Sequence, residues 1–299
     1  MAMKHSLNIL ATLALLWGGM LSAQQVPDTA WHFAANTSPR YAAGKGSTVL
    51  LDAAHHNFHT LQNRYLPFGK VLAADGYQMK SNDAPVTAAA LQACKVFVVS
   101  NPLDSSNIGN WQLPNPSAFN AAEIQAIRDW VQGGGRLLLI ADHMPFAGAA
   151  QALGQAFGFE YQNCFAFDNR QRNTERFLRS NQSLADNVLT RGVDTVVTFT
   201  GSAFKIPPGA TPILALKNYT LTLPRVAWQF EEDTPTLPSE GYFQGAYMAY
   251  GKGRIVVMGE AAMFTAQLAG PNRNPVGMNQ PEARQNNRLL LNIIHWLDE

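Results

Sequence analysis

The chain has 299 residues, of which 46% are hydrophobic and only 14% charged, and its formal net charge is +1 at pH 7. This composition excludes a disordered chain, and the nearly neutral charge balance predicts no nucleic-acid partner. The length allows one large domain or two small ones with a sizeable core.

The first residues have the pattern of a secretory signal. Lys4 precedes an apolar run from Leu7 to Trp17, and small residues follow at Ser22 and Ala23. We expect residues 1–23 to be a signal peptide, with the mature chain periplasmic or secreted and without a transmembrane span. An uncleaved N-terminal anchor is the alternative, although the run is short for a bilayer.

Residues 24–46 predict a surface arm, and the pattern changes at residue 47. Short continuous apolar runs then alternate with segments of helical period. Such runs are typical of strands buried on both faces, so the alternation predicts an α/β fold with a doubly wound, mostly parallel sheet. The expected strands are 47–52, 77–80, 95–100 and 136–142, and the expected helices are 61–76, 87–94, 121–133 and 145–158.

Residues 160–250 predict a β-rich insertion or extension of the same domain, which we place at 47–299. The expected strands there are 193–201, 211–217 and 225–230, and the polar segment 168–183 is expected to be a loop with one helical turn. The α/β pattern returns with a strand near 253–260 and a closing helix within 282–299. The aromatic residues of this β-rich part favour a sheet core, with an exposed docking surface as the alternative: Trp228, Phe230, Tyr242, Phe243 and Tyr247.

Polar side chains follow several of the expected strands, at the point where each strand ends. Because ligands of open parallel sheets bind at the carboxyl ends of the strands, we expect these groups to line one cleft. The expected ligand-binding residues are Asp52, His55, His56, Asn57 and Asn101, and the candidate catalytic residues are Asp142, His143 and Glu260.

The histidines after the first strand also allow a metal site. His55 and His59 are four residues apart, so on a helical turn they would share one face and, with Asp52, could hold a divalent metal. In the alternative interpretation these residues cap helices or fill the cleft as hydrogen-bonded neutral rings. Asp142 and Glu260 could likewise be N-caps of the helices that follow them.

Three stretches resemble the class I glutamine amidotransferase-like superfamily: "WVQGGGRLLLIADHMPFAGAAQALGQAFGF", "GKGRIVVMGEAAMF" and "NNRLLLNIIHWL". They are most similar to an exported branch of unknown function, in which an Asp-x-x-His-x-Asn-like segment follows the first strand and a Gly-Glu-x-x-x-Phe-like segment follows a late one. The resemblance covers about 47–159 and 251–299, and implies a flavodoxin-like sheet with a sharp turn after the strand that ends near Ile140.

The chain departs from that superfamily where its nucleophile stands. The family's cysteine aligns with Ala141 or, with a shift of one residue, Asp142, and Met258 replaces a histidine near the late strand. Without a thiolate there is no covalent acyl acceptor, so we expect no glutaminase activity. Cys94 and Cys164 could pair in an oxidising compartment or remain separate buried thiols, and the sequence leaves both open.

The sequence favours an exported protein that binds a small polar ligand, such as a sugar or a peptide, or another envelope-derived molecule. The alternative is a metal-assisted or acid/base hydrolase of a cell-envelope or extracellular substrate. A choice between binding and catalysis, and the oligomeric state, do not follow from the sequence.

Overall fold

The computed structural model describes residues 25–33, 38–170 and 174–299. The expected signal peptide, residues 1–23, lies outside these ranges. The helices of the described residues are α1 (Leu66–Ala74), α2 (Ala88–Gln92), α3 (Ala121–Gly133), α4 (Phe146–Gln155) and α5 (Asn286–Asp298). The short 3-10 turns are η1 (Ser105–Asn107), η2 (Arg179–Asn181), η3 (Val188–Thr190), η4 (Ala262–Phe264) and η5 (Pro281–Ala283).

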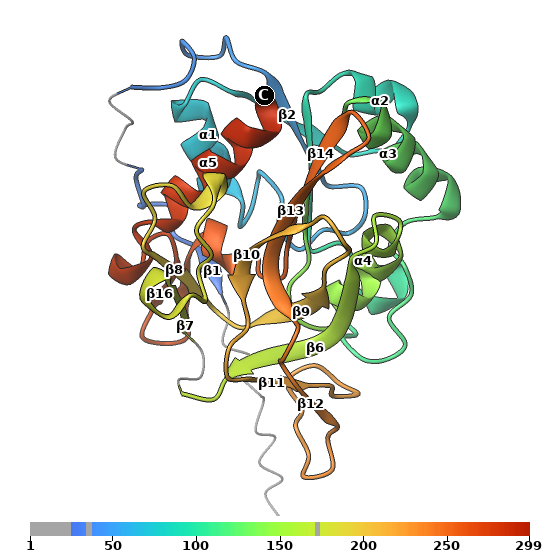
Figure 1. Ribbon diagram of the computed structural model, residues 1–299, viewed down its shortest axis with the longest axis vertical. Coiled ribbons are helices and arrows are strands. Elements are labelled where there is room, and N and C mark those ends of the chain that lie inside the picture. Colours follow the sequence, from blue (N-terminus) through green and yellow to red (C-terminus); the bar gives the residue numbers. More distant parts are fainter. Residues whose placement is uncertain (1–24, 34–37, 171–173) are drawn as a thin grey trace, which may run out of the picture.

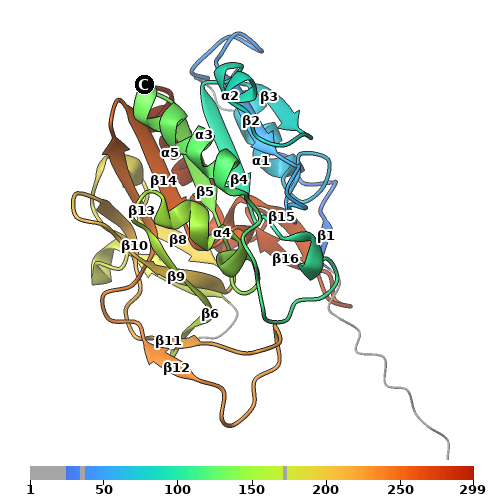
Figure 2. The same cartoon turned by 90° about the vertical axis from the view of Figure 1, so that its right-hand side faces the viewer.

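A mixed sheet of 11 strands forms the centre of the molecule. Five strands pair in parallel in the order β3-β2-β4-β5-β14: β2 (Thr48–Asp52), β3 (Gln78–Asn82), β4 (Val96–Ser100), β5 (Arg136–Ile140) and β14 (Gly253–Met258). The sheet continues with antiparallel pairings through β6 (Glu160–Asp168), β9 (Gly201–Lys205), β10 (Thr211–Ala215), β11 (Tyr219–Thr222), β12 (Thr236–Pro238) and β13 (Phe243–Tyr250). Figure 2 shows β11 and β12 at the end of the molecule farthest from α2 and α3.

Two smaller sheets complete the strands of the described residues. β1 (Val26–Pro27) pairs with β15 (Ala266–Ala269), which pairs with β16 (Asn274–Gly277). β7 (Glu175–Leu178) pairs with β8 (Thr195–Thr198). β15 follows β14 in the chain. Its pairing with β1 therefore fixes the start of the described chain next to the segment that follows β14.

The parallel strands are buried on both faces because helices cover both sides. Along β5, Leu138 and Ile140 pack into one core with α1 and α5, whereas Leu137 and Leu139 pack into the other with α2, α3 and α4. This alternation is the period of two expected of a strand. Figure 1 shows α1 and α5 on one side of the sheet and α2, α3 and α4 on the other.

The structure confirms a mixed α/β fold with a large sheet, whereas the finer flavodoxin-like arrangement stays a prediction. The expected strands and helices of residues 47–159 all occur. Helix α1 starts at Leu66, and Pro67 lies in its first turn. The division into a surface arm, one domain and an inserted lobe also stays a prediction, although β6 to β13 are seen to continue the central sheet.

Two expectations for the middle of the chain were wrong, a strand at 225–230 and a loop without a strand at 168–183, and two strands were not expected. Residues 225–230 form turns and a single bridge at Val226 instead of a strand, and Trp228 there has a φ of +66°, which no regular strand allows. The expected polar loop contains β7 and a 3-10 turn. The long strands β6 and β13 were not expected at all. In the described part of the chain, no helix is long and apolar enough to cross a membrane.

Candidate functional site at the carboxyl ends of the strands

Hydrogen bonds join the ends of β4 and β5 to the segment that follows β2. The side-chain oxygen of Asn101 accepts the Asp142 N–H at 2.8 Å, and the Asn101 carbonyl accepts the Phe58 N–H at 2.9 Å. Asn57 bonds the same edge, because its amide donates to the Ser100 carbonyl at 3.2 Å. The structure therefore brings three of the strand-end segments, predicted separately from the sequence, to one edge of the sheet.

His55 lies between two carboxylates in a buried chain of hydrogen bonds. Its Nδ1 is 2.8 Å from Asp52 Oδ2, at the end of β2, and its Nε2 is 3.1 Å from Glu123 Oε1, in the first turn of α3. The ring also packs on Phe119, with 4.0 Å between centroids. Burial acts to lower the pKa of His55, but the bond and charge of Asp52 and the charge of Glu123 outweigh it and raise that pKa. His55 is thus a cation that ties β2 to α3.

The metal hypothesis finds no support in this geometry. Residues 53–60 form bends, and α1 starts only at Leu66, so the helical spacing assumed for His55 and His59 was wrong. Both ring nitrogens of His55 already face carboxylates. Across the described ranges, no group of three or more His, Cys, Asp and Glu side chains could hold a metal ion.

His59 is instead a buried neutral ring. It packs against Tyr65, with centroids 4.8 Å apart, and against the edge of Phe58 at 5.5 Å. Burial, together with the charge of Arg64, lowers its pKa well below the usual value. Its Nδ1 is buried and has no hydrogen-bond partner in the described structure.

His143 lies in a cluster of aromatic rings directly after β5. Phe165 stacks on it at 4.3 Å, and Trp228 meets it edge-on at 4.9 Å. Burial lowers its pKa to about 4. Its Nδ1 is 2.7 Å from the Met144 carbonyl, which can only accept, so Nδ1 carries the proton and Nε2 keeps its lone pair.

Asp142 belongs to a group of buried carboxyl groups. Burial raises the pKa of Asp142 to about 8, although the hydrogen bond that its Oδ1 accepts from the His143 N–H acts to lower it. Burial and the nearby charge of Asp142 also raise the pKa of Glu260 well above its usual value. A third acid, Glu175 on β7, has its pKa raised by burial to about 7.

Glu260 also has a structural role that the sequence allowed. Its two carboxylate oxygens accept the N–H groups of Ala262 at 2.9 Å and Met263 at 2.7 Å, which is the N-terminal capping of η4. Gly201 of β9 packs against it so closely that an added Cβ would lie 2.9 Å from Glu260 Cβ. The side chain of Glu260 is therefore held, whereas Asp142 retains some exposure.

The strand-end loops hold three non-glycine residues in the left-handed backbone region. His56 and Asn101 both have a φ of +47°, and Thr200 has a φ of +75°. Thr200 is the least suited of the three to this region because it is β-branched, and its N–H is fixed by Glu175 Oε2 at 2.9 Å. Such conformations gather at functional sites, where the surrounding structure holds them in place.

Sequence analysis missed three residues of this edge: Glu123, Glu175 and Arg64. Glu123 lies within the expected helix 121–133, and nothing local in the sequence shows that it reaches His55. Glu175 was assigned to a loop because its neighbours are polar. Arg64 follows Phe58 by six residues, and its guanidinium lies 3.8 Å from the centre of the Phe58 ring. This short spacing between an arginine and an aromatic residue is the signal in the sequence that could have indicated Arg64.

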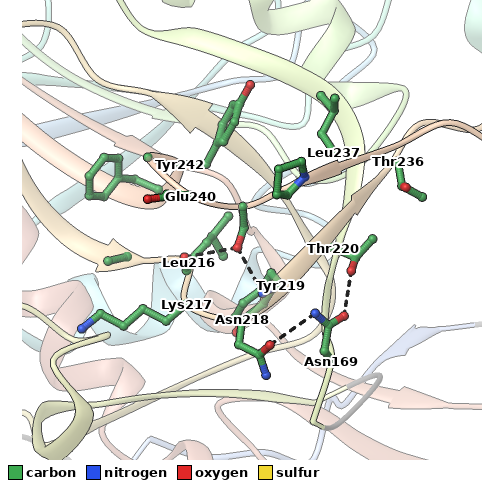
Figure 3. Close-up of a pocket in the computed structure, with 15 residues that line it drawn as sticks. Asn169, Leu216, Lys217, Asn218, Tyr219, Thr220, Thr236, Leu237, Glu240 and Tyr242 are labelled. Atoms are coloured by element: carbon green, nitrogen blue, oxygen red, sulfur yellow. Dashed lines mark hydrogen bonds between the residues drawn. The ribbon is translucent and has the colours of Figure 1, made fainter.

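Two pockets bear on the location of a ligand. One of about 530 Å³ lies at the strand-end edge and is lined in part by His56, Asn57 and Trp111. Another of about 750 Å³ lies at the antiparallel end of the sheet, where Asn169, Asn218 and Thr220 bond one another (Figure 3). This second pocket contains none of the ligand-binding or catalytic residues predicted from the sequence, although Tyr242 and Phe243 line it.

The aromatic docking surface, the alternative to a sheet core, is divided in the structure. Trp228 is 48% exposed and Phe230 is 42% exposed, and both pack on Phe165. Tyr247 instead packs on Trp296 at the opposite side, 4.8 Å between centroids. These residues therefore do not form one face.

A family model described as a domain of unknown function, DUF4350, matches residues 57–270. The chain belongs to the DUF4350 family. The match spans the ends of β4, β5 and β14, so three of the four polar strand ends lie within it. Asp52, His55 and His56 precede the first matched residue. No curated protein matches this DUF4350 chain.

One solved structure supports the fold of this DUF4350 protein, and two others have weaker similarity. The mmIFT52 N-terminal domain superposes with a TM-score of 0.60 at 16% identity, covering 84% of this chain and 97% of that one. A ThuA-like protein from Bacteroides uniformis has a TM-score of 0.48 at 13% identity, covering 89% and 95%. The protein STM1381 from Salmonella typhimurium has a TM-score of 0.48 at 12% identity, covering 84% and 99%. The first likeness shows a shared fold and nothing about activity.

Proposed function

We propose that this protein binds a small polar ligand, a sugar or a peptide, at the carboxyl ends of β2, β4, β5 and β14. The observation that carries the proposal is the set of buried polar atoms at this edge without a partner in the described structure, above all Asn101 Nδ2 and His59 Nδ1. An unpaired buried donor or acceptor costs about 1–3 kcal/mol, so the fold keeps these polar atoms at a cost that a role in function would explain.

The surroundings of His143 also favour such a ligand. The Nε2 lone pair can accept a hydrogen bond from a hydroxyl or amide group, and the Asp142 carboxyl beside it, protonated because its pKa is about 8, can donate one. The apolar rings of Trp111 and Trp228 flank the imidazole, with centroids 6.2 Å and 4.9 Å from it. A few polar groups among aromatic walls are typical of small-molecule sites.

The proposal includes the absence of cysteine-dependent glutaminase chemistry in a chain of amidotransferase-like ancestry. Both cysteines are free thiols, and burial raises the pKa of each to about 12. Cys164 is near the edge, since its carbonyl accepts the Met144 N–H at 3.2 Å, but its side chain is fully buried. Neither thiol is a nucleophile at neutral pH. We also propose that the protein acts outside the cytoplasm, on the strength of the apolar run from Leu7 to Trp17.

The binding proposal is tested with defined neutral probes: glucose, N-acetylglucosamine and the blocked dipeptide N-acetyl-Gly-Gly-NH2. Amide NMR spectra are recorded for the wild type, for Asp142→Ala, and for Asp233→Ala as an exposed control. We expect at least one probe to shift the amides of residues 101 and 142–144 saturably, with the effect lost in Asp142→Ala alone. Saturable binding that persists in Asp142→Ala, or shifts confined to the pocket around Asn169 and Asn218, would count against the proposal.

A hydrolase using acid/base chemistry is the second candidate, favoured by one observation. Asp142 and His143 are neighbours with pKa values moved apart by burial, to about 8 and about 4, which leaves one as an acid and the other as a base near pH 6. Turnover of chromogenic glycosides or peptide anilides by the wild type, abolished in both Asp142→Asn and His143→Gln, would establish it. Turnover that survives either substitution would exclude this pair as its catalysts.

A further inference from the structure

The pocket of about 530 Å³ at the strand-end edge has a basic and amide lining. Its wall includes His56 and Asn57 from the segment after β2, Asn63 and Arg64 from the turn before α1, and Trp111 from the loop after β4. A pocket of this size is large enough for a small organic molecule. The lining contains no Asp or Glu side chain.

Arg64 has no carboxylate partner within the described ranges. The ion pairs of the described residues do not include it, and its two hydrogen bonds go to backbone carbonyls, Phe58 at 3.5 Å and Gln25 at 3.3 Å. Its Nε is buried without a partner there. A guanidinium has five N–H donors, so one N–H on each terminal nitrogen remains uncommitted.

The position of Arg64 orients these donors. Phe58 lies under the guanidinium, with 3.8 Å from Cζ to the ring centroid, so one flat face of the cation is covered. Its hydrogen bonds must then be made along its edge, the direction in which arginine binds a carboxylate or phosphate bidentately. Burial lowers the pKa of Arg64, because the cation is partly removed from water without a compensating anion.

The charges around the pocket are consistent with an anion. His59 lies close to Arg64 and is neutral because burial lowers its pKa. It therefore adds no positive charge of its own beside Arg64. The acid on this side is Asp104, which interacts with His56 and whose Oδ1 is already bound by the N–H and hydroxyl of Ser106. Arg64 is therefore a partly buried cation for which residues 25–33, 38–170 and 174–299 supply no carboxylate counterion.

We propose that this pocket binds the oxyanion group of a ligand, a carboxylate or a phosphate, through the edge of Arg64, with the amides of Asn57 and Asn63 as further donors. The inference rests on the proposed function in one respect: Trp111 lines the pocket and also packs against His143, 6.2 Å between centroids. A single acidic ligand, such as a sugar acid or a peptide C-terminus, would then reach both groups.

The test uses inorganic phosphate and acetate as separate probes, titrated calorimetrically at constant ionic strength with chloride as the reference anion. The variants are Arg64→Gln, Arg64→Lys and the control Arg284→Gln, which removes the same charge from an exposed position. Thermal unfolding confirms that each variant is folded. We expect saturable binding by the wild type and Arg284→Gln, at least tenfold weaker binding by Arg64→Gln, and an intermediate loss in Arg64→Lys, which keeps the charge but not the planar fork.

The outcomes separate this inference from the proposed function. Binding of acetate alone identifies a carboxylate ligand and binding of phosphate alone a phosphate ligand, and either supports the inference. No saturable binding of either anion, or equal binding by Arg64→Gln and Arg284→Gln, overturns it. The neutral probes and Asp142→Ala report on the proposed function independently. Arg64-dependent anion binding without any effect of neutral probes would therefore retain this pocket and reject the sugar or peptide site at Asp142.

Discussion

At the scale of single residues, burial gives Asp142 and His143 opposite properties although they are adjacent in the chain. Removing either group from water disfavours its charged form, which raises the pKa of the carboxyl to about 8 and lowers that of the imidazole to about 4. Both are then neutral near pH 6, one as a donor and the other as an acceptor. This pairing is what makes the edge suited to hydroxyl and amide groups.

The raised pKa of Asp142 predicts a loss of stability as the pH rises. Its value of about 8 in the folded state exceeds the value of about 4 in an unfolded chain. Between these values the folded state holds more protons, so the contribution of Asp142 decreases from pH 4 to pH 8. We expect Asp142→Asn, relative to the wild type, to gain about 1–3 kcal/mol between pH 5 and pH 8 in urea unfolding. An identical pH profile for both proteins would contradict this assignment, and Asp233→Asn is the exposed control.

His55 is expected to matter for stability, because both of its neighbours are buried carboxylates. His55→Ala removes the cation between Asp52 and Glu123 and should lower the free energy of unfolding by about 2–4 kcal/mol. The matched control is His32→Ala, at an exposed position, with an expected change of less than about 0.5 kcal/mol. Urea denaturation followed by circular dichroism measures both. Equal, small losses would show that the chain of bonds through His55 has little structural importance.

At the scale of elements, the N-terminal cap of helix α3 is connected to the site through the carboxylate of Glu123. The Asn120 side chain accepts the N–H groups of Ala122 and Glu123, while Glu123 Oε2 accepts the Asn120 N–H at 3.1 Å. The other oxygen of the same carboxylate is bonded to His55 and to the Val86 N–H at 2.9 Å. One acidic residue thus closes the first turn of the helix and holds the segment after β2.

Asn120→Ala should therefore have two effects. Loss of the cap is expected to cost about 1 kcal/mol of stability, and the loosened first turn should move the His55 ring resonances in NMR spectra. Asn120→Asp keeps the capping oxygen and should restore both. A stability loss without any change at His55 would show that the cap and the imidazole are not coupled.

The sequence predicted elements well where local rules decide them. The capping pattern at Asn120, Pro67 in the first turn of α1 and the continuous apolar runs of β4 and β5 each fix an element through contacts within a few residues. The strand β6 escaped prediction because it pairs with β9 and β11, which are distant in the chain. The strand β13 forms a hairpin with the neighbouring β14, and its pairing was missed although it is local. Trp228 was placed in a strand because an aromatic residue favours one, whereas its turn is fixed by a loop far away in the chain.

The site, too, could be predicted where local rules decide it and could not be predicted where long-range packing does. The strand-end principle located Asn101, Asp142, His143 and Glu260 at one edge, because parallel strands carry their carboxyl ends to the same place. The partners of these residues could not be predicted. Which carboxylate meets His55, and which cation has none, depends on how separate loops pack.

At the scale of the whole molecule, two distant loops meet over His143. Leu113 N–H bonds the Arg225 carbonyl at 2.9 Å, and Ala227 N–H bonds the Trp111 carbonyl at 2.8 Å. This contact holds Trp228 against the imidazole although half of the indole is exposed to water. The low pKa of His143 is therefore a property of the assembled loops.

Trp228→Ala should bring the pKa of His143 closer to the usual value of about 6.5, because water then reaches the ring. The Cε1 proton of His143, followed by NMR from pH 3 to pH 8, measures the shift. Phe230→Ala is the matched control, since Phe230 packs on Phe165 and Trp228 but makes no ring contact with His143. A pKa that stays near 4 in Trp228→Ala would show that burial by the core alone lowers it.

The most direct test of the account is to map where a small polar ligand binds. Amide NMR spectra of the wild type, titrated with the neutral probes and with acetate and phosphate, report on the strand-end edge and on the pocket around Asn169 at once. The account predicts saturable shifts at residues 57, 101 and 142–144, with none at 169 and 218. Saturable shifts only at 169 and 218, or none with any probe, would contradict it.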